Sequence, residues 1–213
     1  MKTDDLIALL ARQPDALPHT NPRRDGWLAG LVGLGAALAL MLTVLGPRPD
    51  LGAAVAAPLF GQKVGALGLL ALVGSAVAIR AGLPGRAASA IEHARWLAPG
   101  WLAIATLLTV LATPHGARAA LFTSPTILVC LTAIPLLSAL PAVGFVWALR
   151  RAAPTNPRRA ARAVGLAAGS LGAFAYAFHC QADQPGYVLL WYGLAIAITV
   201  AASEAIASRW LRW

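Results

Sequence analysis

Apolar residues occur along this chain in long blocks that short polar segments separate. The blocks are close to the roughly 20 residues that a helix needs to span the hydrocarbon of a bilayer. There is no alternating strand pattern of the kind that a membrane barrel needs, so only helices can satisfy the backbone in lipid. The pattern predicts an all-α polytopic membrane protein, a bundle of six transmembrane helices at residues 27–45, 63–80, 96–112, 126–149, 163–178 and 187–206.

Small residues recur at intervals of four within these blocks. Gly165, Gly169 and Ala173 follow this spacing, as do Gly61 and Gly65. Because small side chains allow helix backbones to approach closely in a membrane, both sets predict tight helix contacts. Residues 51–62 are only mildly apolar, so we expect them at the membrane interface rather than in a span.

Residues 1–26 form a polar segment of their own, ahead of a transmembrane domain at 27–213. The segment holds four aspartates and three prolines, which argues against a cleaved signal peptide. Its start predicts a short amphipathic helix, with Asp4 and Asp5 in the first turn and an apolar face made of Leu6, Ile7, Leu9 and Leu10. So short a helix is marginal alone, which favours docking on a partner, although lying flat on the membrane is the alternative.

Basic residues give the predicted orientation. With the N-terminus in the cytoplasm, the cytoplasmic segments hold 14 of the 17 Lys and Arg residues and the outside segments hold 3. Cytoplasmic loops of membrane proteins carry such an excess. Six spans then return the C-terminus to the cytoplasm, so we expect a multi-pass protein of the bacterial inner membrane with both termini inside.

Composition agrees with this class. Apolar residues make up 59% of the chain and charged residues only 12%, against about 25% charged in typical soluble domains. The net charge of +9 does not indicate nucleic-acid binding, since the basic residues stand in the gaps between apolar blocks and not on one soluble face. The lipid bilayer is the partner that the composition predicts.

Ionisable residues are nearly absent from the predicted spans, which argues against an enzyme. Glu204 is the exception; it lies near the inner end of the last span, where the surface or a nearby arginine would satisfy it. The sequence has no paired carboxylates, no zinc-protease motif and no phosphate-binding loop. We therefore predict no catalytic residues and no resident cofactor.

The two cysteines are the main candidates for chemistry. Cys130 lies about one turn inside the outer end of the fourth span, and Cys180 lies just past the outer end of the fifth. The predicted topology places both at the outer surface, together with His179, Asp183 and His115. Thiols bind soft metals and react with oxidants as thiolates, so a sensor is one interpretation. The alternative is that Cys130 is a small buried apolar residue and Cys180 an ordinary loop residue.

Several stretches together resemble the NrsF family of membrane anti-sigma factors. They are the opening MKTDDLIALLA, the RPDL at 48–51, the glycine-rich block from Gly165 to Asp183 with Trp191-Tyr192 after it, and the ending RWLRW at 209–213. The resemblance runs from end to end, and the hairpin between the fifth and sixth spans is its most specific part.

The resemblance implies an anti-sigma factor that holds an extracytoplasmic-function sigma factor through residues 1–22. It implies release on heavy-metal or oxidative stress sensed at Cys130 and Cys180, with a transient soft metal at these thiols, His179 and Asp183 as one possibility. Whether the thiols bind metal or form a disulfide stays open, as does the role of His115. A small transporter or lipid-modifying enzyme is the alternative function, and a membrane scaffold without sensing is a third.

Overall fold

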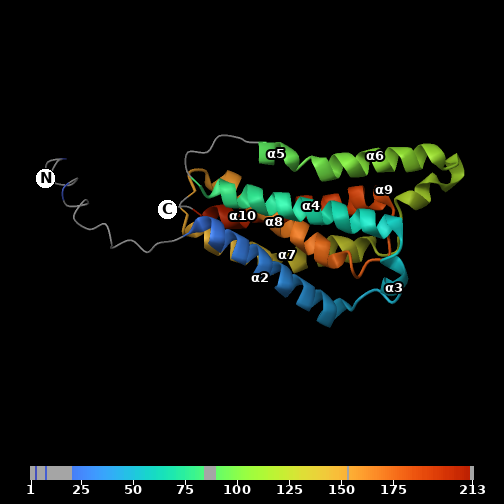
Figure 1. Cartoon of the computed structure of the whole chain (residues 1–213), viewed down its shortest axis with the longest axis horizontal. Coiled ribbons are helices and arrows are strands. Elements are labelled where there is room, and N and C mark those ends of the chain that lie inside the picture. Colours follow the sequence, from blue (N-terminus) through green and yellow to red (C-terminus); the bar gives the residue numbers. More distant parts are fainter. Residues whose placement is uncertain (1–2, 4–7, 9–20, 84–89, 153, 212–213) are drawn as a thin grey trace.

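The computed structural model describes residues 3, 8, 21–83, 90–152 and 154–211. Throughout this part the regular structure is helical (Figure 1). The elements are α2 (Pro22–Leu40), η2 (Met41–Leu45), α3 (Leu51–Ala54), α4 (Pro58–Ala81), α5 (Ala90–Ala94), α6 (Leu97–Ala112), η3 (His115–Leu121), α7 (Ile127–Arg150), α8 (Pro157–Tyr176), α9 (Pro185–Tyr187), η4 (Val188–Tyr192) and α10 (Gly193–Trp210). The predicted docking face at Leu6, Ile7, Leu9 and Leu10 lies outside the described residues.

Two of the long helices begin with the same four residues, Asn-Pro-Arg-Arg. In α2 the Asn21 side chain accepts a hydrogen bond from the Arg24 N–H at 3.2 Å, and in α8 Asn156 accepts one from the Arg159 N–H at 3.0 Å. Proline follows each asparagine, where its missing N–H costs nothing and its fixed φ favours a helix. Asparagine caps therefore explain why α8 begins at Pro157, ahead of the predicted residue 163.

The long helices run back and forth as a bundle with α8 at its centre (Figure 1). α8 packs against α4, α7 and α10, and 14 of its 20 residues are buried. α6 lies at one edge of the bundle, and its buried residues are Ala98, Leu102 and Thr106. We call the end with the α8–α9 loop the thiol end, and the opposite end, where α2 and α8 begin, the arginine end.

Five helices in the described part are long and apolar enough to cross a membrane: Pro22–Leu45, Pro58–Ala81, Ala90–Ala112, Ile127–Arg150 and Pro185–Trp210. α8 is not among them, since Arg158, Arg159 and Arg162 stand in its first turns and alanine and glycine fill much of the rest. Its 20 residues nonetheless rise about 30 Å, the thickness of the hydrocarbon. The all-helical architecture, with several helices long and apolar enough to cross a membrane, is thus confirmed, and six spans stay a prediction.

Close helix contact is found at one predicted set of small residues and not at the other. A Cβ on Gly165 would lie 2.6 Å from the Cα of Val200 in α10, so only glycine fits there. Gly169 also faces α10, and Ala173 is fully buried. Gly61 and Gly65 have no neighbour within 4 Å, so the expectation of tight packing there was wrong. Gly61 lies in the part of α4 that extends the predicted second span back to Pro58, where proline favours a helix start, and Gly65 lies just inside the predicted span.

Candidate functional site

The two cysteines lie in one buried cluster at the thiol end. Cys130 is fully buried in the first turn of α7, Cys180 is 1% exposed in the loop after α8, and the two are not bridged. Thr126 connects them: its carbonyl accepts the Cys130 N–H at 2.9 Å, and its hydroxyl lies 3.8 Å from the Cys180 Sγ. The expectation that Cys180 is an ordinary loop residue does not fit this burial.

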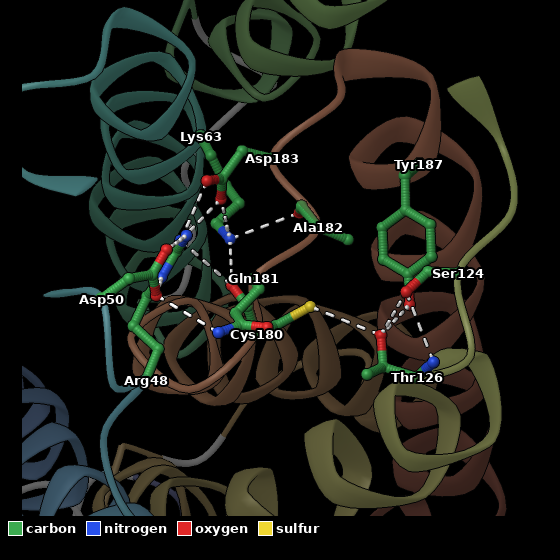
Figure 2. A network of polar contacts seen from close by, with 10 residues as sticks. All are labelled: Arg48, Asp50, Lys63, Ser124, Thr126, Cys180, Gln181, Ala182, Asp183 and Tyr187. Carbon is green, nitrogen blue, oxygen red and sulfur yellow. Dashed lines mark hydrogen bonds and ion pairs between the residues drawn. The ribbon is translucent and has the colours of Figure 1, made fainter. Parts of the chain in front are cut away.

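Three buried tyrosines surround the thiols. The Tyr187 hydroxyl lies 3.2 Å from the Thr126 hydroxyl (Figure 2), and the Tyr192 ring lies against the rings of Tyr187 and Tyr176 at centroid distances of 6.3 and 5.7 Å. The hydroxyl groups of Tyr176 and Tyr192 have no hydrogen-bond partner among the described residues. A buried hydroxyl without a partner costs free energy, so each of these two O–H groups would gain from a hydrogen-bond acceptor nearby. Both lie beside the thiols and can donate a hydrogen bond there.

A buried ion network holds the Cys180 loop from the other side (Figure 2). Lys63 of α4 and Arg48 of the α2–α3 loop both pair with the Asp183 carboxylate, Arg48 at 2.9 Å. The Lys63 Nζ also donates to the Cys180 carbonyl at 2.7 Å and to the Ala182 carbonyl at 3.3 Å. The Lys63 side chain is fully buried, so Asp183 and these carbonyls together must offset the cost of taking its charge out of water.

Arg48 joins the network to a second carboxylate. Its Nε and Nη2 each donate to Asp50 at 2.8 Å, a bidentate pair. The Arg48 guanidinium holds the pKa of Asp50 well below its usual range, and Asp50 in turn raises the pKa of Arg48. Two cations and two carboxylates therefore form a neutral group.

Backbone contacts complete the connection between the two loops. The Arg48 N–H donates to the Phe178 carbonyl at 3.0 Å, and the His179 Nδ1 lies 2.8 Å from the Gly46 carbonyl oxygen. The loop that carries Cys180 is thus attached to the loop after α2 through both backbone and side chains. This fixes the position of Cys180 relative to α2 and α4.

The predicted metal ligands are engaged elsewhere in the structure. His179 contacts the Gly46 carbonyl oxygen, and Asp183 pairs with Lys63 and Arg48. Within the described ranges, no three His, Cys, Asp or Glu side chains come together in a way that could hold a metal ion. His115 is exposed in η3, where its Nδ1 lies 2.9 Å from Arg118. A soft metal at the two thiols stays a prediction.

Sequence reasoning missed Arg48 and Lys63 as site residues. A signal was present, since they are two of the three basic residues that stand on the predicted outer side against the charge bias. A basic residue on the predicted outer side, against the charge bias, indicates a specific partner, here Asp183.

Glu204 was expected to reach the surface or to pair with a nearby arginine. It pairs with Arg162 of α8 at 2.7 Å.

The fold and this site define a multi-span helical membrane protein with a buried thiol cluster at one end. The family model described as "Negative regulator of sigma F" matches residues 10–213, so the chain belongs to the NrsF family of anti-sigma factors, whose partner is a sigma factor. It is 37% identical to the "Anti-sigma-F factor NrsF" of Caulobacter vibrioides over 224 residues. It is 33% identical to the "Probable anti-sigma-F factor NrsF" of Azospira oryzae over 214 residues. Both matches cover all of each chain. No solved structure matches the chain.

Proposed function

We propose that this anti-sigma factor holds an extracytoplasmic-function sigma factor at the cytoplasmic face of the bacterial inner membrane, and releases it when a heavy metal or an oxidant acts on Cys130 and Cys180. The observation that carries the sensing part is the single buried cluster in which the two thiols lie, within a chain that has only these two cysteines. Family membership supports the regulatory part.

Three features of the cluster suit a thiol sensor. Both thiols are buried in one apolar cluster, and Thr126, one turn before Cys130, places its hydroxyl 3.8 Å from the Cys180 Sγ; one soft metal ion or one disulfide would therefore engage both. The unpartnered hydroxyls of Tyr176 and Tyr192 can donate to a thiolate, which is the reactive form. Burial keeps the thiols from reacting until the loop opens, so the protein stays in the holding state without stress.

α8 is the element through which a change at the thiols would reach the cytoplasm. Cys180 follows its last turn, and its first turns carry Arg159 and Arg162, which pair with Glu92 and Glu204 at 2.7 Å. Because α8 is the buried centre of the bundle, a shift at its thiol end displaces its neighbours rather than α8 alone. These two exposed ion pairs at the arginine end are weak and can rearrange.

The sigma factor would dock on residues 1–22 by the apolar face at Leu6, Ile7, Leu9 and Leu10. This requires the N-terminus in the cytoplasm, which the bias of basic residues supports. With α8 as a sixth span, the C-terminus would lie in the cytoplasm as well. Alkaline phosphatase fused after Trp213 should then be inactive, and fused after Asp183 it should be active. The reverse pattern would exclude six spans with both termini in the cytoplasm.

The docking segment is tested by co-purification of the sigma factor with tagged full-length protein in mild detergent. We expect the double variant L6D/L10D to lose the sigma factor and to switch on its regulon, since charge replaces the apolar face. Ala8 lies on the opposite side of the same predicted helix, so A8D is the matched control and should retain binding. Binding that survives in L6D/L10D would exclude this docking mode.

A further inference from the structure

A cavity lies at the arginine end, beside the edge helix α6. α6 contacts α9 and η4 toward the thiol end, whereas at the arginine end an empty space of about 780 Å³ is lined by α4, α5, α6, α8 and α10. This volume falls within the roughly 300–1,000 Å³ of small-ligand sites. The first turns of α6, which bury Ala98 and Leu102, therefore stand beside a space that no described side chain fills.

Four arginines and a single carboxylate line the cavity. Arg159 pairs with Glu92, and Arg162 pairs with Glu204 on α10. The remaining two, Arg95 and Arg158, have no ion pair within the part of the chain that the structure describes. The cavity therefore carries an excess of positive charge, contributed by α8 and by the turn between α5 and α6, which are far apart in sequence.

Apart from Asn156, the rest of the lining is apolar, and part of it belongs to the middle of the long helices. Leu70 of α4, Leu166 of α8, and Ile196 and Val200 of α10 continue the cavity away from the arginines. Trp96, exposed at the start of α6, stands at the basic end, a common position for tryptophan at the level of lipid headgroups. One end of the cavity thus suits an anion, and its length suits a hydrocarbon chain.

A second cavity provides a contrast within the same molecule. It has a volume of about 600 Å³ between α7 and α10, and Arg150 is the one charged residue in its lining. Any lipid chain could fill such a space without regard to its headgroup. Selectivity for charge is thus expected of the first cavity and not of the second.

We propose that the first cavity binds one anionic phospholipid, with its phosphate between Arg95 and Arg158 and an acyl chain along Leu166 and Val200. Guanidinium groups bind phosphate through paired N–H donors, and basic pockets between membrane helices on the cytoplasmic side suit anionic headgroups. The lipid would complete the packing of α6 against α8 and α10. The site lies at the end opposite the thiols and is independent of the proposed sensing.

Native mass spectrometry of the full-length protein from mixed phosphatidylglycerol and phosphatidylethanolamine bilayers tests this. We expect the wild type to retain phosphatidylglycerol over phosphatidylethanolamine by about tenfold or more, since each arginine near a headgroup favours the anion. R95Q/R158Q should lose most of this preference. R23Q/R24Q, which removes two exposed arginines of α2 at the same end, should keep it.

Three results would overturn the proposal: no preference in the wild type, a preference that persists in R95Q/R158Q, or an equal loss in R23Q/R24Q. The acidic N-terminal segment is the rival occupant. If D4N/D5N took up several-fold more phosphatidylglycerol than the wild type, the segment and not a lipid would fill the cavity. All four exchanged arginines are exposed, and unchanged thermal unfolding would confirm that both double variants fold.

Discussion

The two ends of the bundle differ in how their charged side chains are buried and paired. At the thiol end Lys63 and Arg48 are buried, and Asp183 and Asp50 neutralise them. At the arginine end, basic residues outnumber acids, the ion pairs of Arg159 and Arg162 are exposed, and a cavity remains. One end is thus held in a single geometry, whereas the other can change its contacts at little cost.

This difference suits the sensor that we propose, whose input and output would lie on opposite sides of a membrane. A site that must recognise a small chemical change benefits from fixed neighbours, because any displacement then has a defined direction. A site that must release a protein benefits from weak contacts that exchange easily. α8 belongs to both ends, with Cys180 after its last turn and its arginines in the first.

The largest expected difference between the ends is in the cost of breaking an ion pair. K63A should lower the free energy of unfolding by about 3–5 kcal/mol, because Asp183 loses a buried partner and the Cys180 carbonyl loses its donor. R162A breaks the exposed pair with Glu204 and should lower the free energy of unfolding far less, because solvent screens the pair. Thermal unfolding followed by tryptophan fluorescence in detergent measures both, and equal losses would contradict the comparison.

Packing should also differ between the central helix α8 and the edge helix α6. A Cβ on Gly172, in the half of α8 near the thiol end, would lie 2.8 Å from the Ile134 carbonyl oxygen of α7, so G172A should cost about 1–3 kcal/mol. Gly100, in the first turn of α6 at the arginine end, has nothing within 4 Å. G100A should therefore be neutral or slightly stabilising, since alanine favours helices. A destabilised G100A would show that α6 is packed more tightly than the structure has it.

Tyr192 allows a smaller test of the thiol cluster. Its hydroxyl is buried and has no partner among the described residues, so Y192F removes an unsatisfied group. We expect the variant to be as stable as the wild type or more stable, by up to about 1 kcal/mol. A clear loss of stability would mean that the hydroxyl already holds a hydrogen bond. Thr126, which contacts Tyr187 and Cys180, makes T126V the matched variant, and there we expect a loss.

The smallest effect concerns pH. Arg48 lowers the pKa of Asp50 below its ordinary value of about 3.9, so the carboxylate is charged in both the folded and unfolded states at neutral pH. Its contribution is fully present above the ordinary pKa and is lost as the pH falls through the lowered folded value. The difference in melting temperature between the wild type and D50N should thus stay constant from pH 5 to 8 and shrink only below about pH 4. A difference that varies between pH 5 and 8 would mean that another group titrates with it.

Local patterns in the sequence predict much of this architecture. Apolar blocks of membrane-spanning length locate the five apolar helices, because burial in lipid requires each block to be continuous. The spacing of Gly165 and Gly169 predicts the contact with α10. The start of α8 at Pro157 was placed too late, since its arginines look like a loop until the Asn156 cap is recognised.

The ion network was not predictable in the same way. Arg48 and Asp183 are 135 positions apart, and Lys63 and Cys180 are 117 apart. Such pairs depend on how α4 and α8 pack, which no local pattern contains. The two cysteines were placed at one surface because topology alone decides that, whereas their burial among Tyr176, Tyr187 and Tyr192 requires the three-dimensional structure.

The most direct test of the sensing proposal is the response of cells that carry single cysteine variants. C130S and C180S should each abolish induction of the sigma regulon by cadmium and by an oxidant, because a site made by two thiols fails when either is lost. Serine nearly preserves the shape of each cysteine side chain. As a control, H115A should keep the full response. A full response to both stimuli in either C130S or C180S would contradict the shared thiol site.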